Sequence, residues 1–132
     1  MNNKDIKNII EYWKKTAEHD YKTMLYLFKG KQFSNSLFFG HIVLEKILKA
    51  LVVQEIKEQA PCIHDLVRLQ KIAKLELSKE EINFLNKIND FNIRTRYPEY
   101  KLQFYKICTK KYTENYFNKI IELYKKLCQK LK

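Results

Sequence analysis

Only two glycines and two prolines interrupt this chain of 132 residues. Glycine and proline are the residues that most often end helices and form turns, so their scarcity favours long helices joined by few connections. A chain of this length is typical of a single core, and we expect one domain over residues 1–132. The sequence shows neither the alternation expected of strands nor an internal repeat.

Apolar residues recur at helical spacing in five segments. These cover residues 5–29, 32–58, 63–75, 78 to about 91 or 92, and about 102 to the end. Four are long and the third is short, so the sequence predicts an all-α bundle of four long helices plus a shorter helix. The aromatic residues of the last segment are expected to pack in the core rather than to stack on bases.

The second segment is the most apolar and carries apolar residues on two faces, so we expect it to contact other elements on two sides. Gly40 in its middle costs about 1 kcal/mol relative to alanine, which indicates a close helix crossing. His41 lies on the apolar stripe, and no second histidine follows it by one turn. We therefore predict a hydrogen-bonded core histidine, and no metal site.

Helix-end signals mark three positions. Gly30 is placed to end the first helix. Ser78 and Glu81 have the spacing of a capping box. Asp65, next to His64, stands at the start of the third helix, where a carboxylate stabilises exposed amides. Capping is the expected role of His64 and Asp65, and a role in a binding site is the alternative.

The stretch NIRTRYPEY, residues 92–100, is expected to be an irregular loop. Pro98 disfavours the α conformation at Tyr97, so the preceding helix is predicted to end near Phe91 or Asn92. Arg94, Arg96, Tyr97 and Glu99 would then project from a loop. Loops on a rigid scaffold often carry function, although a stiff connection with solvated charges explains the same residues.

The chain is strongly basic, with a formal net charge of +11. Residues 100–132 hold nine lysines against two glutamates. Such a basic end attracts nucleic acid or another polyanion. The chain is also rich in Lys, Ile and Asn throughout, so the same charge is explained by a composition bias.

Three cysteines, Cys62, Cys108 and Cys128, show no CxxC spacing, which favours a reduced, cytoplasmic protein. The longest nearly apolar run, LFFGHIVL, is too short to cross a bilayer, so no membrane contact is expected. The first residues are charged and lack an apolar stretch, so we expect no signal peptide.

Four motifs follow one another in the chain: WKKTAEHDYKTMLYLFKGKQF, LEKILKALV, PCIHDLVRL and NIRTRYPEY. In this order and spacing the sequence resembles a HEPN domain, from about Trp13 to Leu127. The resemblance implies an up-and-down helical bundle that commonly forms homodimers. It also implies either nucleotide binding or ribonuclease toxin activity, often beside a minimal nucleotidyltransferase that acts as antitoxin.

The ribonuclease branch of that family carries an arginine followed, after four to six residues, by a histidine. Counted from Arg94 and from Arg96, the corresponding positions hold Glu, Tyr, Lys, Leu and Gln. Because a histidine titrates in the range that proton transfer needs, its absence lowers the expectation of catalysis. An arginine still binds phosphate through two hydrogen bonds.

The resemblance and the basic loop together predict a module that binds nucleotide or RNA phosphate without a cofactor or metal. The ligand-binding candidates are Arg94, Arg96, Tyr97, Glu99, Lys49, His64 and Asp65, and the expected supporting residues are Asp20, Glu45 and Pro98. Two alternatives remain: a ribonuclease in which His64 or Tyr100 moves protons, and a module that only binds protein. Arg96 is equally suited to pair with Asp20, Glu45 or Asp65 and so to hold the bundle together.

A homodimer is the last expectation. The two apolar faces of the second segment exceed what one bundle contact requires, and a large exposed apolar patch usually marks an interface. Two-fold pairing there would bring two arginine loops together. The alternative is a monomer in which both faces are buried. For Asp20 in the first segment we expect either a partner on another helix, which is a basic group or a hydroxyl, or a boundary position open to water.

Overall fold

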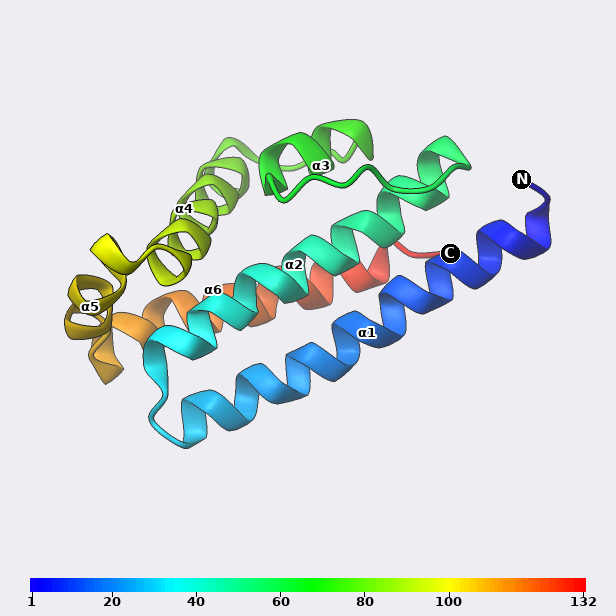
Figure 1. Ribbon diagram of the computed structural model, residues 1–132. Helices are drawn as coiled ribbons and strands as arrows, with labels where there is room; N and C mark the ends of the chain where they lie inside the picture. Colours follow the sequence, from blue (N-terminus) through cyan, green and yellow to red (C-terminus); the bar gives the residue numbers. More distant parts are fainter.

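A computed structural model describes residues 1–132 as six helices without a strand (Figure 1). The helices are α1 (Asn3–Lys29), α2 (Phe33–Ile56), α3 (Leu66–Ile72), α4 (Lys79–Arg96), α5 (Pro98–Ile107) and α6 (Lys110–Gln129). The predicted all-α bundle is confirmed, with four long helices. Two shorter helices, α3 and α5, complete the fold where one was expected. None of the six helices has the length and apolarity that crossing a membrane would require.

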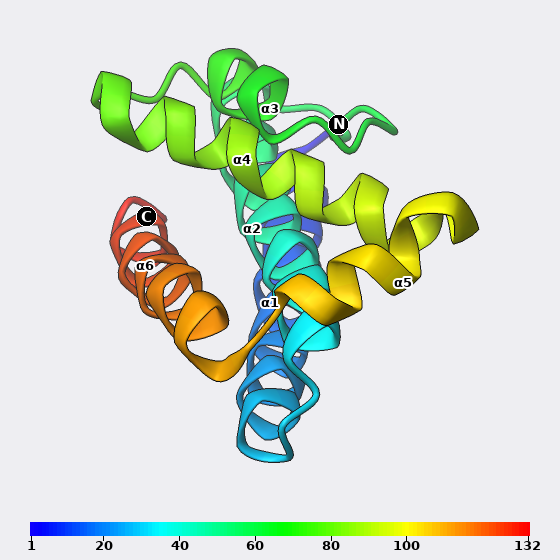
Figure 2. The same ribbon diagram turned by 90° about the vertical axis from the view of Figure 1, so that its left-hand side faces the viewer.

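Helix α2 is the centre of the fold. It packs against α1, α6, α3 and α4, and α1 lies on the opposite side of it from α3 and α4 (Figures 1 and 2). Its contacts on two sides are therefore confirmed. They also remove the argument for a dimer through α2, because the chain's own helices cover the faces that were expected to be left open.

Gly40 allows the close approach of α2 and α6. A β-carbon at this position would lie 2.6 Å from Cδ1 of Ile120, which is fully buried on α6. A separation this short is a clash between the two carbons. The close crossing predicted from a glycine in mid-helix is thus confirmed.

The helix-end signals are confirmed. Gly30 follows the last residue of α1. Ser78 Oγ accepts from the Glu81 amide at 3.1 Å, and Glu81 Oε1 accepts from the Ser78 amide at 2.9 Å. Asp65 Oδ1 accepts from the amides of Val67 and Arg68 at the start of α3. The third helix itself is shorter than the predicted 63–75, because Asp65 fixes its first turn at Leu66.

The predicted loop at residues 92–100 is wrong. Helix α4 continues through Arg96, and Pro98 is the first residue of α5. Tyr97 alone leaves the helical conformation, with φ −100° and ψ 125°, as expected of a residue before proline. Proline is well tolerated at the first position of a helix, where its missing N–H has no partner to lose. The proline therefore separates two helices by one residue and does not end α4 early.

The last predicted helix is two helices. The backbone breaks at Cys108 and Thr109, and Thr109 Oγ1 accepts from the Tyr112 amide at 3.3 Å to cap α6. Helix α5 is held to the rest by one buried side chain, Phe104, whose ring lies 5.2 Å from that of Phe91 on α4. The aromatic residues of α6 pack inward as predicted, with Phe117 stacked on Phe28 at 4.2 Å between ring centres.

Candidate functional site

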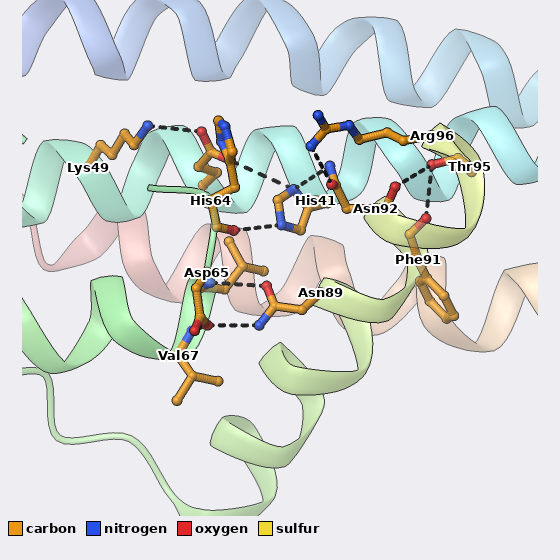
Figure 3. Close-up of polar contacts among 12 residues, drawn as sticks. His41, Lys49, His64, Asp65, Val67, Asn89, Phe91, Asn92, Thr95 and Arg96 are labelled. Atoms are coloured by element: carbon orange, nitrogen blue, oxygen red, sulfur yellow. Dashed lines mark hydrogen bonds and ion pairs between the residues drawn. The ribbon is translucent and has the colours of Figure 1, made fainter. Parts of the chain in front are cut away.

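Polar side chains line one face of α4. Asn86, Asn89, Asn92 and Arg96 follow one another at spacings of three, three and four residues, so they share one side of the helix. Opposite them lies the segment that links α2 to α3, with His64 and Asp65 (Figure 3). Between the two is an open pocket of about 380 Å³, lined by His41, His64, Asp65, Asn86, Asn89, Asn92, Ile93 and Arg96.

A chain of hydrogen bonds crosses this pocket from α4 to the linking segment. The Arg96 guanidinium donates to Asn92 Oδ1 at 3.4 Å, which leaves the Asn92 amide nitrogen to donate to His41 Nδ1 at 3.2 Å. His41 Nε2 then donates to the His64 carbonyl at 3.0 Å. His41 is therefore a neutral, hydrogen-bonded core histidine, as predicted, and burial lowers its pKa.

His64 is oriented by a carboxylate. Glu45 Oε1 lies 3.0 Å from His64 Nδ1, and Glu45 Oε2 accepts from Lys49 at 3.0 Å. The His64 side chain is 62% exposed, and with Nδ1 donating to Glu45 its Nε2 remains for a ligand. Lys49, in contrast, is buried, and its ammonium group lies 5.2 Å from the centre of the Trp13 ring. Lys49 therefore stabilises Glu45 and does not line the pocket.

Asp65 joins α3 to α4. Its Oδ1 accepts from the Asn89 amide at 2.9 Å as well as from the two amides of α3, while Asn89 Oδ1 accepts from the Leu66 amide at 3.0 Å. The expected capping role is confirmed for Asp65 but not for His64, whose ring contacts Glu45 instead. Asp65 also lines the pocket, so the two roles that the sequence left open coexist in one residue.

Arg94 lies apart from this pocket. Its Nε is 3.0 Å from Asp90 Oδ2, and its guanidinium lies 5.9 Å from the centre of the Phe104 ring. It lines a different pocket, of about 350 Å³, together with Asp90, Ile93, Tyr100 and Gln103. The structure thus does not bring the two arginines together, because residues two apart on a helix point to different sides.

The remaining candidates lie outside the pocket. Tyr97 and Glu99 are exposed at the junction of α4 and α5, where Pro98 starts α5. Asp20 pairs with Lys46 of α2, so the predicted partner on another helix is confirmed. Arg96 pairs with none of Asp20, Glu45 and Asp65, and its expected alternative role as a structural ion pair is wrong.

Sequence reasoning missed the asparagines of the pocket. None of Asn86, Asn89 and Asn92 is among the predicted site residues, although their spacing of three, with Arg96 one turn further, is a visible signal. Extending α4 past Asn92 would have placed them on one side. The position of His64 opposite this stripe had no such signal, since it depends on how the linking segment folds back.

The pocket offers one guanidinium without an acidic partner, an exposed imidazole and several amides. A guanidinium of this kind binds phosphate or carboxylate through paired hydrogen bonds. No three His, Cys, Asp or Glu side chains are placed to hold a metal ion.

The three cysteines are free, and burial raises the pKa of Cys108 to about 11, so this thiol stays protonated at neutral pH.

In a comparison with protein families, a family model described as "HEPN domain" matches residues 10–132. No curated protein and no solved structure matched the chain significantly.

Proposed function

Because the chain belongs to the HEPN domain family, we propose that its α4 pocket binds the phosphate of a nucleotide or of an RNA strand. One observation carries the proposal. Arg96 is a charged group at the pocket that no carboxylate neutralises, whereas Arg94, two residues away, is paired with Asp90. A buried or paired arginine stabilises a fold; an unpaired one held beside a pocket is available to an anion.

The surrounding contacts prepare Arg96 for this role. Its hydrogen bond to Asn92 fixes one side of the guanidinium and leaves the other donors for a ligand. Asn92 is in turn fixed by His41, which is buried. A donor that is already oriented loses less conformational freedom when it binds. The lysines of α6 and the chain's net charge of +11 add a long-range attraction for polyanions.

Binding of nucleotides and short RNAs, measured by calorimetry over a range of salt concentrations, tests the proposal. We expect Arg96→Ala to weaken binding by about tenfold or more, since one charge-assisted contact contributes about 1.5–3 kcal/mol. Arg94→Ala is the matched control, and it should bind as the wild type does. Equal binding by the wild type and Arg96→Ala would exclude the pocket.

A ribonuclease is the second candidate, and the placement of His64 favours it. The Glu45–His64 pair resembles the arrangement in which a carboxylate orients a catalytic imidazole. In this reaction His64 Nε2 takes the proton of a ribose 2′-hydroxyl, and the 2′-oxygen attacks the phosphorus. The bond from phosphorus to the 5′-oxygen breaks, that oxygen takes a proton from water, and His64 releases its proton to the solvent. Arg96 stabilises the charge that develops on the phosphate.

Cleavage of a fluorescent structured RNA without metal tests this candidate. Loss of cleavage in His64→Gln supports it, provided that His19→Gln, a change of an exposed histidine on α1, retains the activity of the wild type. An absence of cleavage by the wild-type protein, with binding intact, leaves the binding function alone.

We also propose that the protein is a homodimer in the cytoplasm and acts with a minimal nucleotidyltransferase. The support for a dimer comes from α5, where Leu102 and Tyr105 are each 64% exposed. Exposed apolar side chains next to one another usually mark an interface. Light scattering at micromolar concentration measures the mass: one chain of 16.1 kDa would contradict the dimer. A neighbouring gene for a small nucleotidyltransferase would support the pairing.

A further inference from the structure

The α4 pocket has two chemically different ends. Arg96 supplies positive charge at one end, while Asp65 supplies a carboxylate at the other. Asp65 uses a single oxygen for its structural role: Oδ1 accepts from Val67, Arg68 and Asn89. Oδ2 accepts none of the hydrogen bonds within the protein. Because Asp65 lines the pocket, this second carboxylate oxygen is left to accept from a donor on the ligand.

The three asparagines of the pocket also differ in whether their side-chain amides have partners within the protein. Asn89 and Asn92 have both ends of their amides engaged, with Leu66 and Asp65 for the first and with Arg96 and His41 for the second. Asn86 is exposed and lines the pocket, and its side chain makes no hydrogen bond within the protein. An unengaged amide presents a donor and an acceptor side by side, which suits the edge of a nucleobase.

The distances along α4 fit one nucleotide. The Arg96 side chain reaches back one turn, to Asn92. From Asn92 to Asn86 the helix rises by about 9 Å over six residues. This rise is comparable with the separation between the phosphate and the base edge within a nucleotide. A phosphate at Arg96 thus puts the base beside Asn86 and Asp65.

We propose that this pocket selects nucleotides whose base carries an exocyclic amino group, as adenine, cytosine and guanine do, and discriminates against uracil. The inference rests on the proposed binding of a nucleotide phosphate at Arg96. Asp65 Oδ2 accepts from the amino group, and the Asn86 amide bonds to the adjoining edge of the base. A uracil places a carbonyl oxygen where cytosine has its amino group, so this oxygen faces the carboxylate, and the donor that uracil keeps, N3–H, lies one position further along the edge of the base. Buried or half-buried polar groups left unpaired in this way are the main source of such discrimination.

Two pairs of ligands isolate the amino group: CMP against UMP, and AMP against IMP. Within each pair an amino group is exchanged for a carbonyl, and the adjoining ring nitrogen changes from an acceptor to an N–H donor, which the Asn86 amide can match with either of its ends; the phosphate and the sugar are unchanged. We expect calorimetry to show about tenfold tighter binding of CMP and AMP than of their partners. Equal affinities within both pairs would overturn the proposal while leaving phosphate binding at Arg96 in place. Failure of all four ligands and of short RNAs to bind would overturn the proposed function as well.

The substitution Asp65→Asn tests the residue. Asparagine caps helices about as well as aspartate, so Oδ1 can still accept from the α3 amides. Its amide nitrogen then replaces Oδ2 and donates to a carbonyl, which should remove or reverse the preference for CMP over UMP. Asp5→Asn, at an exposed position on α1 outside the pocket, is the control and should keep the preference. An unchanged preference in Asp65→Asn would overturn the assignment.

A second variant guards against loss of the fold. Asn86 has no partner in the protein, so Asn86→Ala should fold normally. We expect this variant to bind CMP and AMP several fold more weakly and to bind inorganic phosphate as the wild type does. Unchanged binding of the nucleotides would count against the proposed position of the base.

Discussion

Arg94 and Arg96 are two residues apart on α4 and serve opposite purposes. Arg94 pairs with Asp90 and lies over the Phe104 ring, so it ties α4 to α5. Arg96 donates to the amide of Asn92 and has no acidic partner. Because residues two apart on a helix point to different sides, one arginine has a structural role and the other is available to a ligand.

Asn92 should be a positioning residue for Arg96. Asn92→Ala removes the acceptor of Arg96 and the donor to His41 Nδ1, which then stays buried without a partner. We expect a loss of stability of about 1–3 kcal/mol, measured by urea unfolding, together with weaker anion binding. Asn86→Ala is the control and should change stability by less than about 0.5 kcal/mol. Equal stability losses for the two variants would contradict the role of Asn92.

Stability should fall as the pH drops below 7. Burial lowers the pKa of His41 from its ordinary 6.5, so below that value the unfolded chain binds more protons than the folded protein. The free energy of unfolding is therefore highest above the unfolded pKa and decreases by up to about 1.4 kcal/mol per pH unit below it. Unfolding measured between pH 7 and pH 5 gives this slope. His41→Gln should reduce the slope and His19→Gln should keep it; the same slope in all three proteins would show that other groups cause it.

The crossing at Gly40 should show energetic coupling with Ile120. In the wild type, Gly40→Ala places its methyl group against Cδ1 of Ile120 and should destabilise the fold, since overpacking costs about 1–3 kcal/mol. Ile120→Val removes the methyl group that clashes. In that background, Gly40→Ala should be neutral or stabilising, because alanine favours a helix by about 1 kcal/mol over glycine. A double-mutant cycle measures the coupling, and additive effects would contradict the clash.

Lys57 should be a site of easy stabilisation. It ends α2 with φ 60° and ψ 30°, a left-handed conformation that disfavours side chains with a β-carbon. Lys57→Gly should therefore raise the free energy of unfolding by about 0.5–1 kcal/mol. Lys57→Ala, which removes the charge but keeps the β-carbon, should bring no gain. A comparable gain from alanine would point to charge rather than to backbone conformation.

Local signals in the sequence predicted much of the fold. The scarcity of glycine and proline and the capping box at Ser78 act through nearby residues, and the helices they predicted were confirmed. The mid-helix Gly40 correctly indicated a close crossing, although its partner Ile120 lies on a distant helix. The error at Pro98 came from a competing effect of the same kind: proline starts a helix as readily as it ends one. Thr109 likewise starts α6 inside a segment that reads as continuous.

The candidate site was predicted only in part, because it depends on distant segments. Arg96, His64 and Asp65 were among the candidates, and the structure places all three at one pocket. Their meeting follows from the linking segment lying against α4, where Asn89 bonds to both Asp65 and Leu66. Pairings between residues more than twenty positions apart leave no period in a sequence. Lys49 was a predicted binding residue but lies outside the pocket, because its place beside Trp13 depends on how α1 packs on α2.

The single-residue joint at Tyr97 has a consequence for local unfolding. Helix α5 follows it directly and buries only Phe104, so releasing one ring frees the whole helix from the core. The free energy that opens a segment depends on how much apolar surface it buries, and α5 has the least to lose. In the monomer its amide hydrogens should exchange with solvent well before those of α2, whose opening requires the entire protein to unfold; a dimer through α5 would slow the exchange of the α5 amides. Helix α5, whose amides exchange early, is thus next to Arg96, while the pocket also contains His41 of α2, whose amides exchange late.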